Sequence, residues 1–381
     1  MKHVLFILPS LSIGGLERVQ VTIANKLVQS GYDVTIKTLY PNDTLKDELD
    51  ERVHFVYKPP KRHFGSRVPY IRNKLFDDGM WEKRASAKQL YDYYVDNEKY
   101  DIEIAFFRGL PVKIISGSSN HNAKHIAWVH SDPSMAGGYI ANFKSLSEAT
   151  EAYKTFDRVI CVSKQSADGF ERLFGDIGSV GVIYNMLPVD AIKKKALESS
   201  GISIKKAEFH VVLVGHFIDK TKGQSRLINA VFKLKNEGVE ISLALIGSGN
   251  DESLFKRTIS ENCANDYITV CDGGRNPYPY IKEADLLVCA SYFEGYNLTV
   301  AEALILGVPV LSTDCTGPNE ILDYGKYGMI VENSEDGLYS GLKQFAENPG
   351  LLKDYKVKAL KRQDFFNEDK ILKQITDLFS E

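Results

Sequence analysis

The sequence has no long apolar run, few cysteines and no excess of basic charge. Its first apolar stretch, "VLFIL", is five residues long and is ended by Pro9, which is too short for the core of a signal peptide. No later stretch reaches the roughly eighteen apolar residues that predict a membrane-spanning helix. We therefore expect a cytoplasmic protein without a membrane-spanning helix.

The five cysteines are scattered along the chain and form no C-x-x-C pair. This pattern favours structural thiols in a reducing compartment over a zinc site or disulfides. The net charge of −3 disfavours a nucleic-acid-binding protein, which is usually basic. The 381 residues and the hydrophobic fraction of 44% indicate two or three globular domains, each with its own core.

Short β-branched runs alternate with amphipathic stretches of helical length. The runs are crowded with apolar residues instead of alternating with polar ones, which is typical of parallel strands covered on both faces. Strand, loop and helix repeating in this way predict doubly wound α/β sheets. The expected strands are 3–8, 33–40, 53–57, 101–106, 124–129 and 158–163 in the first half, and 209–214, 241–246, 267–271, 285–290 and 308–313 in the second.

Both halves open with a strand and a glycine-containing loop that leads into a helix. Between them lies a polar, lysine-rich and weakly patterned stretch, which we interpret as a linker. The predicted organisation is a Rossmann-like domain over 1–185, the linker over 186–207, a second Rossmann-like domain over 208–362 and an amphipathic C-terminal helix over 363–381.

The first glycine loop does not have the spacing of a dinucleotide-binding motif. "LSIGGLE" lacks G-x-G-x-x-G, and "TLYPND" after the second strand offers no acid for a ribose. The pair Gly14 and Gly15 instead permits a close approach to a helix N-terminus, whose free N–H groups favour an anion. An ordinary tight turn explains the pair equally well.

Two glutamates flank the start of an apolar helix in "SYFEGYNLTVAEALILGVPV". Asn297 is a good N-cap, so we expect a helix from there to about Leu306, ended by Gly307. Glu294 then lies on the preceding loop and Glu302 more than one turn inside the helix. A diphosphate at this N-terminus would lie between the two carboxylates. The spacing is also compatible with a capping acid and a buried ion pair.

The motifs together resemble the retaining glycosyltransferases of family 4 with the GT-B fold. The E-x7-E from Glu294 to Glu302 is followed by "AEALILGVPVLSTDCTGPNEIL", and "GGLE", "WVHSDP", "VGHFIDKTKG" and "NPYPYIKEAD" occur at the matching places along both halves. The resemblance implies two Rossmann-like domains facing across a cleft, with the C-terminal helix returning to the first domain. It also implies transfer of a hexose from a nucleotide diphosphate sugar, here a UDP-sugar, with retention at the anomeric carbon.

The resemblance assigns most of the donor-binding residues to the second half. Glu302 would hold the ribose and Glu294 the hydroxyls of the transferred sugar. Lys222 would neutralise the leaving diphosphate. His216 stands where relatives usually carry an arginine and would be a weaker clamp, because histidine is charged only when protonated. The other expected donor contacts are the backbone N–H groups of Asn297, Leu298 and Thr299, the loop glycines Gly247 and Gly249, and Gly14 and Gly15 on the distal phosphate.

The catalytic residues implied by the resemblance are His130, Lys222 and Glu294. His130 would lie near the reacting centre, although a satisfied histidine at a strand end is the alternative. Fixed cations and helix N–H groups can stabilise the charge that develops on the diphosphate. No Asp-x-Asp cluster stands out, so we expect neither a metal ion nor another cofactor. The leaving phosphate is expected to take the acceptor proton, without a protein base.

On the acceptor side, Arg108 in "FFRGLP" ends a strand and would meet a phosphate of a glycan or polyprenyl-diphosphate-linked acceptor. The stretch 58–74 is rich in lysine and arginine and has interspersed apolar residues. It predicts weak peripheral docking on the anionic inner face of the cell membrane, unless it is a solvated basic loop.

Two other functions fit the same fold. A UDP-sugar 2-epimerase would need catalytic acids in the first domain, whose positions the sequence does not indicate. A non-catalytic glycan-binding relative would not need the intact set of Glu294, Glu302 and Lys222.

Overall fold

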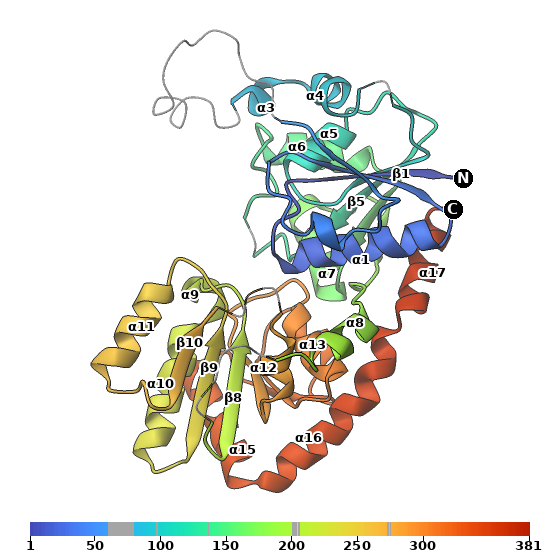
Figure 1. Cartoon of the computed structure of the whole chain (residues 1–381). Coiled ribbons are helices and arrows are strands. Elements are labelled where there is room, and N and C mark those ends of the chain that lie inside the picture. Colours follow the sequence, from blue (N-terminus) through green and yellow to red (C-terminus); the bar gives the residue numbers. More distant parts are fainter. Residues whose placement is uncertain are drawn as a thin grey trace. The chain divides into compact units, whose positions relative to one another are not determined.

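The computed structural model describes residues 1–59, 80–96, 98–135, 137–199, 204, 206–272, 274 and 276–381. The chain forms two compact units (Figure 1). The first contains Met1–Met186 together with Asp369–Glu381, and the second contains Leu187–Glu368.

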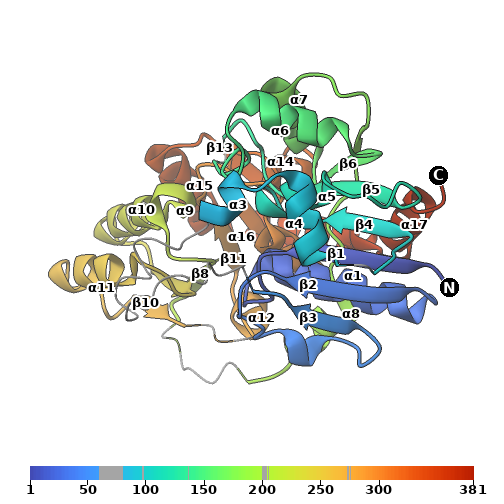
Figure 2. The same ribbon diagram turned by 90° about the horizontal axis from the view of Figure 1, so that it is seen from above.

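The first unit is built on a parallel sheet with the strand order β3-β2-β1-β4-β5-β6-β7. Viewed from above, the first six of these follow one another in this order (Figure 2). The central strands are buried along nearly their whole length, as apolar parallel strands must be when helices cover both faces. The strands are β1 (His3–Leu8), β2 (Asp33–Thr38), β3 (His54–Tyr57), β4 (Ile102–Ala105), β5 (Lys124–Val129), β6 (Arg158–Cys161) and β7 (Val180–Val182).

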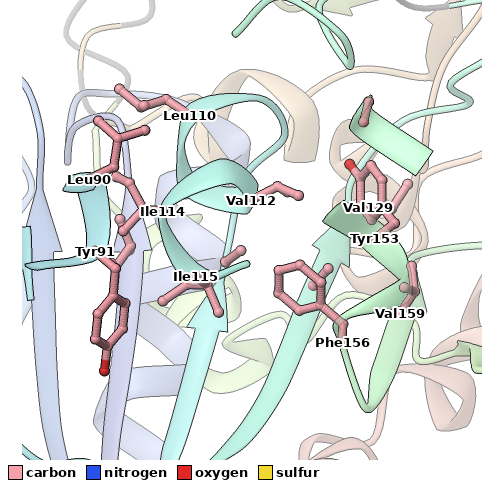
Figure 3. Close-up of a cluster of buried hydrophobic side chains, with 14 of the residues drawn as sticks. Leu90, Tyr91, Leu110, Val112, Ile114, Ile115, Val129, Tyr153, Phe156 and Val159 are labelled. Carbon is pink, nitrogen blue, oxygen red and sulfur yellow. The ribbon is translucent and has the colours of Figure 1, made fainter. Parts of the chain in front are cut away.

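Serine caps start several helices of this unit. Ser86 and Gln89 form a capping box, and Ser163 accepts a hydrogen bond from the backbone of Ser166. Figure 3 shows the side chains of α5 between those of α4 and those of β5, α6 and β6, in one buried core. The helices are α1 (Gly15–Gln29), η1 (Lys46–Glu48), α3 (Met80–Arg84), α4 (Ala87–Tyr94), α5 (Leu110–Ile115), α6 (Leu146–Lys154), α7 (Lys164–Phe174) and the C-terminal α17 (Glu368–Leu378).

The second unit has a parallel sheet with the order β10-β9-β8-β11-β12-β13 and its own apolar core. Its strands are β8 (Phe209–Val214), β9 (Ile241–Ile246), β10 (Ile268–Cys271), β11 (Leu286–Cys289), β12 (Val310–Thr313) and β13 (Met329–Val331). Its helices are α8 (Val189–Lys195), α9 (Asp219–Lys222), α10 (Gln224–Asn236), α11 (Glu252–Glu261), α12 (Tyr278–Lys282), α13 (Leu298–Ile305), α14 (Pro318–Ile321), α15 (Glu335–Glu347), α16 (Pro349–Arg362) and η2 (Gln363–Phe366).

The junction between the units differs from the expected linker over 186–207. The second unit begins at Leu187, and α8 forms within the lysine-rich stretch. Ile192 is buried and α8 packs against α12 and α13. A helix that buries a single apolar side chain shows little hydrophobic periodicity in its sequence, so α8 was not predicted.

The C-terminal residues pack on the first unit, where both chain ends lie. Lys2 Nζ donates to the carbonyl of Phe379 at 2.8 Å, and Arg158 forms an ion pair with Glu381 at 3.0 Å. The ring of Phe379 also meets the ring of Tyr32 edge-on.

The predicted doubly wound α/β architecture is confirmed in both units. Each sheet reverses its strand order between two central strands, β1 and β4 in the first and β8 and β11 in the second. Ligands of such sheets bind beyond the carboxyl ends of the strands at this switch point. The loops after these four strands are therefore the places to look for a site.

Candidate functional site

A pocket opens at the switch point of the second sheet. It lies between the ends of β8 and β11, the end of α9 and the start of α13. Its lining residues are Leu213, Val214, Lys222, Leu287, Val288, Cys289, Ala290, Ser291, Glu294, Asn297 and Thr299. The structure thus brings together four residues that the sequence predicted for a donor site, namely Lys222, Glu294, Asn297 and Thr299.

An ion pair between Lys222 and Glu294 dominates the pocket. Lys222 Nζ lies 2.6 Å from Glu294 Oε1, and the Glu294 side chain is only 11% exposed. Ser291 Oγ at 2.6 Å and Asn297 Nδ2 at 3.0 Å donate to the same oxygen. All three donors therefore converge on Oε1. Within the part of the chain that the structure describes, Oε2 accepts none of them and can still accept a hydrogen bond from a ligand.

The charge of Lys222 is stabilised by its partner. Burial on its own would lower the pKa of the ammonium group, but the charge and hydrogen bond of Glu294 outweigh it and raise that pKa above its usual value. Lys222 is therefore a permanent cation at neutral pH, held in place before any ligand binds.

The start of α13 supplies N–H groups beside this cation. Asn297 caps the helix as predicted, because its side chain accepts from Val300 N at 3.1 Å while its backbone lies in the left-handed region. Its amide donates to Glu294, so one residue connects the helix start with the acid. The first N–H groups of a helix have no acceptor within the helix. Those of Leu298 and Thr299 can therefore bind an anion.

Glu302 does not line the pocket with Glu294. It lies in the second turn of α13 and is 8% exposed, and Tyr278 Oη of α12 donates to its Oε1 at 3.3 Å. Along the chain, Glu294 precedes the start of α13 and Glu302 lies inside the helix. The tyrosine contact was not expected from the sequence.

Several supporting residues escaped the sequence analysis. Arg226, which is buried, donates from Nε to the carbonyl of Ala290 at 2.9 Å and stacks 3.9 Å from the ring centre of Tyr292. This contact fixes the end of β11, from which the Ser291–Glu294 loop begins. A buried arginine bonded to a carbonyl gives no periodic signal in a sequence.

Two cysteines, Cys289 and Cys315, lie close to Glu294. The contact between the two thiols lowers the pKa of Cys289, although burial opposes this, and it raises the pKa of Cys315. Asn297 Nδ2 also lies 3.1 Å from Cys289 Sγ. All five cysteines are free thiols, as expected.

The remaining predicted donor residues lie on neighbouring loops. His216 follows β8 and is exposed, while its carbonyl accepts from Gln224 at 2.8 Å. Gly247 follows β9, and a Cβ atom there would come within 2.0 Å of the carbonyl oxygen of Gly215. A Cβ atom on Gly249 would come within 2.5 Å of the carbonyl oxygen of Phe217. These two glycines therefore allow the loops after β8 and β9 to pack together.

In the first unit, Gly14 is the N-cap of α1 and Gly15 is its first residue. The carboxylate of Glu17 folds over this helix start, with Oε2 about where a side chain on Gly14 would lie. Burial raises the pKa of Glu17, opposed by hydrogen bonds from its backbone and from Ser12. An anion at this helix start would have to displace the carboxylate, which the sequence did not indicate.

Arg108 lies in the loop after β4, one of the two switch-point strands of the first sheet, and His130 directly follows the neighbouring strand β5. The ring of His130 meets that of Phe106 edge-on at 4.5 Å. Burial lowers the pKa of His130 to about 3, and the nearby charge of Arg108 contributes, so the imidazole is neutral at physiological pH. Its Nε2 is buried and has no hydrogen-bond partner among the residues that the structure describes. The expectation of a satisfied strand-end histidine is therefore not met.

Other expectations concern metals and membranes. Within the described residues, no three His, Cys, Asp or Glu side chains cluster as a metal site would require, and no helix is long and apolar enough to cross a bilayer. The basic stretch 58–74 falls mostly outside the described residues, since only Lys58 and Pro59 of it are described.

Models of two glycosyltransferase families match the chain, one in each unit. The family described as "Glycosyltransferase Family 4" matches residues 13–191, and the one described as "Glycosyl transferases group 1" matches residues 208–348. The fold and these matches define a glycosyltransferase of the GT-B class. The chain belongs to the family 4 type of these enzymes.

Curated relatives agree with this family. The chain is 30% identical over 192 residues to an N-acetylgalactosamine-N,N'-diacetylbacillosaminyl-diphospho-undecaprenol 4-alpha-N-acetylgalactosaminyltransferase of Campylobacter jejuni. This alignment covers 50% of each of the two chains. It is 23% identical to an uncharacterized glycosyltransferase of Haemophilus influenzae, over 98% of this chain and 99% of that protein. The first alignment thus spans only half of the relative.

Solved structures share the whole fold. Anabaena HepE in complex with UDP and glucose superposes with a TM-score of 0.77 at 17% identity, over 100% of both chains. WaaG, a glycosyltransferase involved in lipopolysaccharide biosynthesis, gives 0.66 at 14% identity, over 99% of both chains. At these identities the likeness shows the fold alone.

Proposed function

We propose that this protein transfers a hexose from a UDP-sugar to a growing cell-surface polysaccharide or lipid-linked glycan, with retention at the anomeric carbon. The observation that carries the proposal is the convergence of Lys222, Glu294 and the start of α13 in one pocket. A permanent cation and free helix N–H groups suit a diphosphate, and a carboxylate with an unused oxygen suits sugar hydroxyls.

The printed names of relatives support the choice of substrates. Anabaena HepE has been crystallised with UDP and with UDP-glucose. The Campylobacter relative acts on a diphospho-undecaprenol-linked sugar, and a Bacillus subtilis relative is a poly(glycerol-phosphate) alpha-glucosyltransferase. UDP-hexoses and phosphate-linked acceptors are therefore the first substrates to test.

The pocket residues suggest how the reaction is assisted. When the anomeric C–O bond breaks, negative charge develops on the diphosphate. Lys222 and the N–H groups of Leu298 and Thr299 are already oriented and can stabilise that charge without reorganising. The proposal assigns no metal ion and no protein base, since the leaving phosphate takes the acceptor proton.

The test is a panel of nucleotide sugars, scored for release of UDP with and without lipid-linked acceptors. The proposal predicts release from at least one UDP-hexose, stimulated by an acceptor and lowered about tenfold or more in a folded Glu294→Gln variant. Conversion of the sugar without release of UDP would indicate an epimerase instead. Binding of acceptors without any turnover would indicate a non-catalytic relative.

We also propose that the basic stretch docks the enzyme weakly on anionic membranes. Each basic residue near an anionic leaflet contributes about 1 kcal/mol, so removing several should be measurable. Exchanging Lys61, Arg62 and Arg67 for serine should reduce sedimentation with phosphatidylglycerol vesicles and leave hydrolysis of the donor in solution unchanged. Equal sedimentation of both proteins would exclude this role.

A further inference from the structure

At the switch point of the first sheet, Arg108 is a half-buried cation without an acid to neutralise it. It lies in the loop between β4 and α5. Within the described residues, no carboxylate comes within ion-pair distance of its guanidinium, and its single hydrogen bond runs from Nη1 to Ser131 Oγ at 3.3 Å. A guanidinium has five N–H donors, so most of them remain available to a ligand.

The neighbouring acid is already engaged elsewhere. Asp132 is 4% exposed, and its carboxylate accepts from Ser134 N at 2.8 Å and forms an ion pair with Arg172 at 3.2 Å. Asp132, two residues beyond His130, thus forms its ion pair with Arg172 and not with Arg108.

The guanidinium of Arg108 is held in place by its surroundings. It lies 5.0 Å from the ring centre of Phe107 and 5.3 Å from that of Tyr139. Tyr139 Oη donates to the carbonyl of Ser131 at 2.8 Å and lies 2.9 Å from its hydroxyl. Gly138 has φ +94, and a Cβ atom there would lie 2.9 Å from Arg108 Nε. The 137–138 turn therefore packs directly on the arginine.

A second observation points to a ligand at the same place. In the described part of the chain, the buried Nε2 of His130 has no hydrogen-bond partner. In the neutral imidazole one ring nitrogen donates and the other accepts. A buried ring nitrogen without a partner is costly in either role, and a hydroxyl of a bound molecule, which can donate or accept, would satisfy it.

We propose that Arg108, supported by Ser131 and Tyr139, binds a phosphate group of the acceptor, and that the acceptor is therefore a phosphate or diphosphate ester. This rests on the proposed glycosyltransferase function and adds the side chains of the first unit that would recognise the phosphate of the acceptor. Sugar linked through a diphosphate to a lipid, and sugar on a phosphate-containing polymer, share this chemistry. A neutral glycan does not.

The test measures binding of two probes to the full-length protein saturated with UDP, which occupies the phosphate-binding groups of the donor pocket. The probes are geranyl diphosphate, which carries a short lipid, and inorganic pyrophosphate, which carries none. We expect geranyl diphosphate to bind to the wild type. Arg108→Gln should lower this affinity about ten- to hundredfold, because a hydrogen-bonded charge is lost. Arg108→Lys should lower the affinity less, since lysine keeps the charge.

The matched control is Arg158→Gln, which removes an exposed arginine of the same unit that is already paired with Glu381. If pyrophosphate binds as tightly as geranyl diphosphate, the site recognises the phosphates alone. If pyrophosphate binds more weakly, the lipid also contributes to binding. Either result supports the anion site, provided that Arg108→Gln weakens the binding of the probe. Equal affinity of the wild type, Arg108→Gln and Arg108→Lys for both probes would overturn the inference, while failure to bind UDP would overturn the proposed function instead.

Discussion

Each sheet has a basic side chain beyond one of its two central strands, Lys222 in α9 after β8 and Arg108 in the loop after β4, and the surroundings of the two charges differ. At the switch point of the second sheet, Lys222 forms an ion pair with Glu294 at 2.6 Å. At that of the first sheet, Arg108 has only a hydroxyl partner among the described residues, and the nearby His130 stays neutral. The paired cation keeps a pocket ordered for a ligand that brings both phosphates and hydroxyls. The unpaired cation suits a ligand that brings the missing negative charge itself.

Removing the paired cation should have the largest effect. Lys222→Ala deletes the fixed charge that we propose stabilises the leaving diphosphate, and it leaves Glu294 with two donors instead of three. By analogy with the loss of one oxyanion donor, kcat should fall about a hundred- to thousandfold. Steady-state release of UDP measures this. Lys220→Ala, on the exposed face of the same short helix, should be nearly silent. Comparable kinetics for the two variants would mean that Lys222 is structural only.

The neutral histidine of the first unit should make stability sensitive to acid. The pKa of His130 is lowered from 6.5 to about 3 in the fold, so in acid the unfolded chain takes up a proton that the folded protein does not. This contribution is complete above pH 6.5 and is lost as the pH falls toward 3. It amounts to about 2 kcal/mol between pH 6.5 and pH 5.

Urea unfolding at about pH 7.5 and about pH 5 checks this. His130→Asn should show a smaller loss of unfolding free energy at the acid pH than the wild type. His121→Asn, which changes an exposed histidine, should behave as the wild type does. The same acid loss in all three proteins would show that His130 is protonated in the fold.

The two acids of the second unit should separate sugar binding from nucleotide binding. Glu294→Gln should lower transfer about tenfold or more, because a carboxylate bonded to hydroxyls is lost, while UDP binds normally. Glu302→Ala should lower the affinity for UDP and for the nucleotide-sugar donor alike. Turnover compared with calorimetry of UDP measures both effects. Near-normal turnover of Glu294→Gln would return that residue to a structural role.

The smallest effect is expected at His216. It is exposed and is not part of the pocket lining, so His216→Ala should reduce kcat/KM only severalfold, well below the loss in Lys222→Ala. His216→Arg should keep or improve transfer, because arginine is always charged. If kcat/KM falls as far in His216→Ala as in Lys222→Ala, His216 contributes as much as Lys222 to binding the diphosphate.

The sequence predicted those features that rest on local patterns. The apolar runs predicted eleven strands that the structure contains, and Asn297 was recognised as a cap because N-caps depend on residue type. The three-residue strands β7 and β13 were not among them, since runs this short carry no usable period.

Features that depend on distant contacts could not be predicted. The lysine-rich 186–207 stretch gave no sign that Ile192 would anchor a helix. The contacts of Arg226 with Ala290 and of Glu302 with Tyr278 join residues far apart in the chain. The engagement of Asp132 by Arg172, which leaves Arg108 unpaired, depends on how the loop after β5 meets α7.

The measurement that tests the account most directly is calorimetric titration of UDP into the wild type, Lys222→Ala and Arg108→Gln. The account places the nucleotide at the paired cation of the second unit. It predicts one UDP per chain, an affinity weakened about tenfold or more by Lys222→Ala, and no change in Arg108→Gln. Equal affinity of the wild type and a folded Lys222→Ala, or a loss confined to Arg108→Gln, would contradict it.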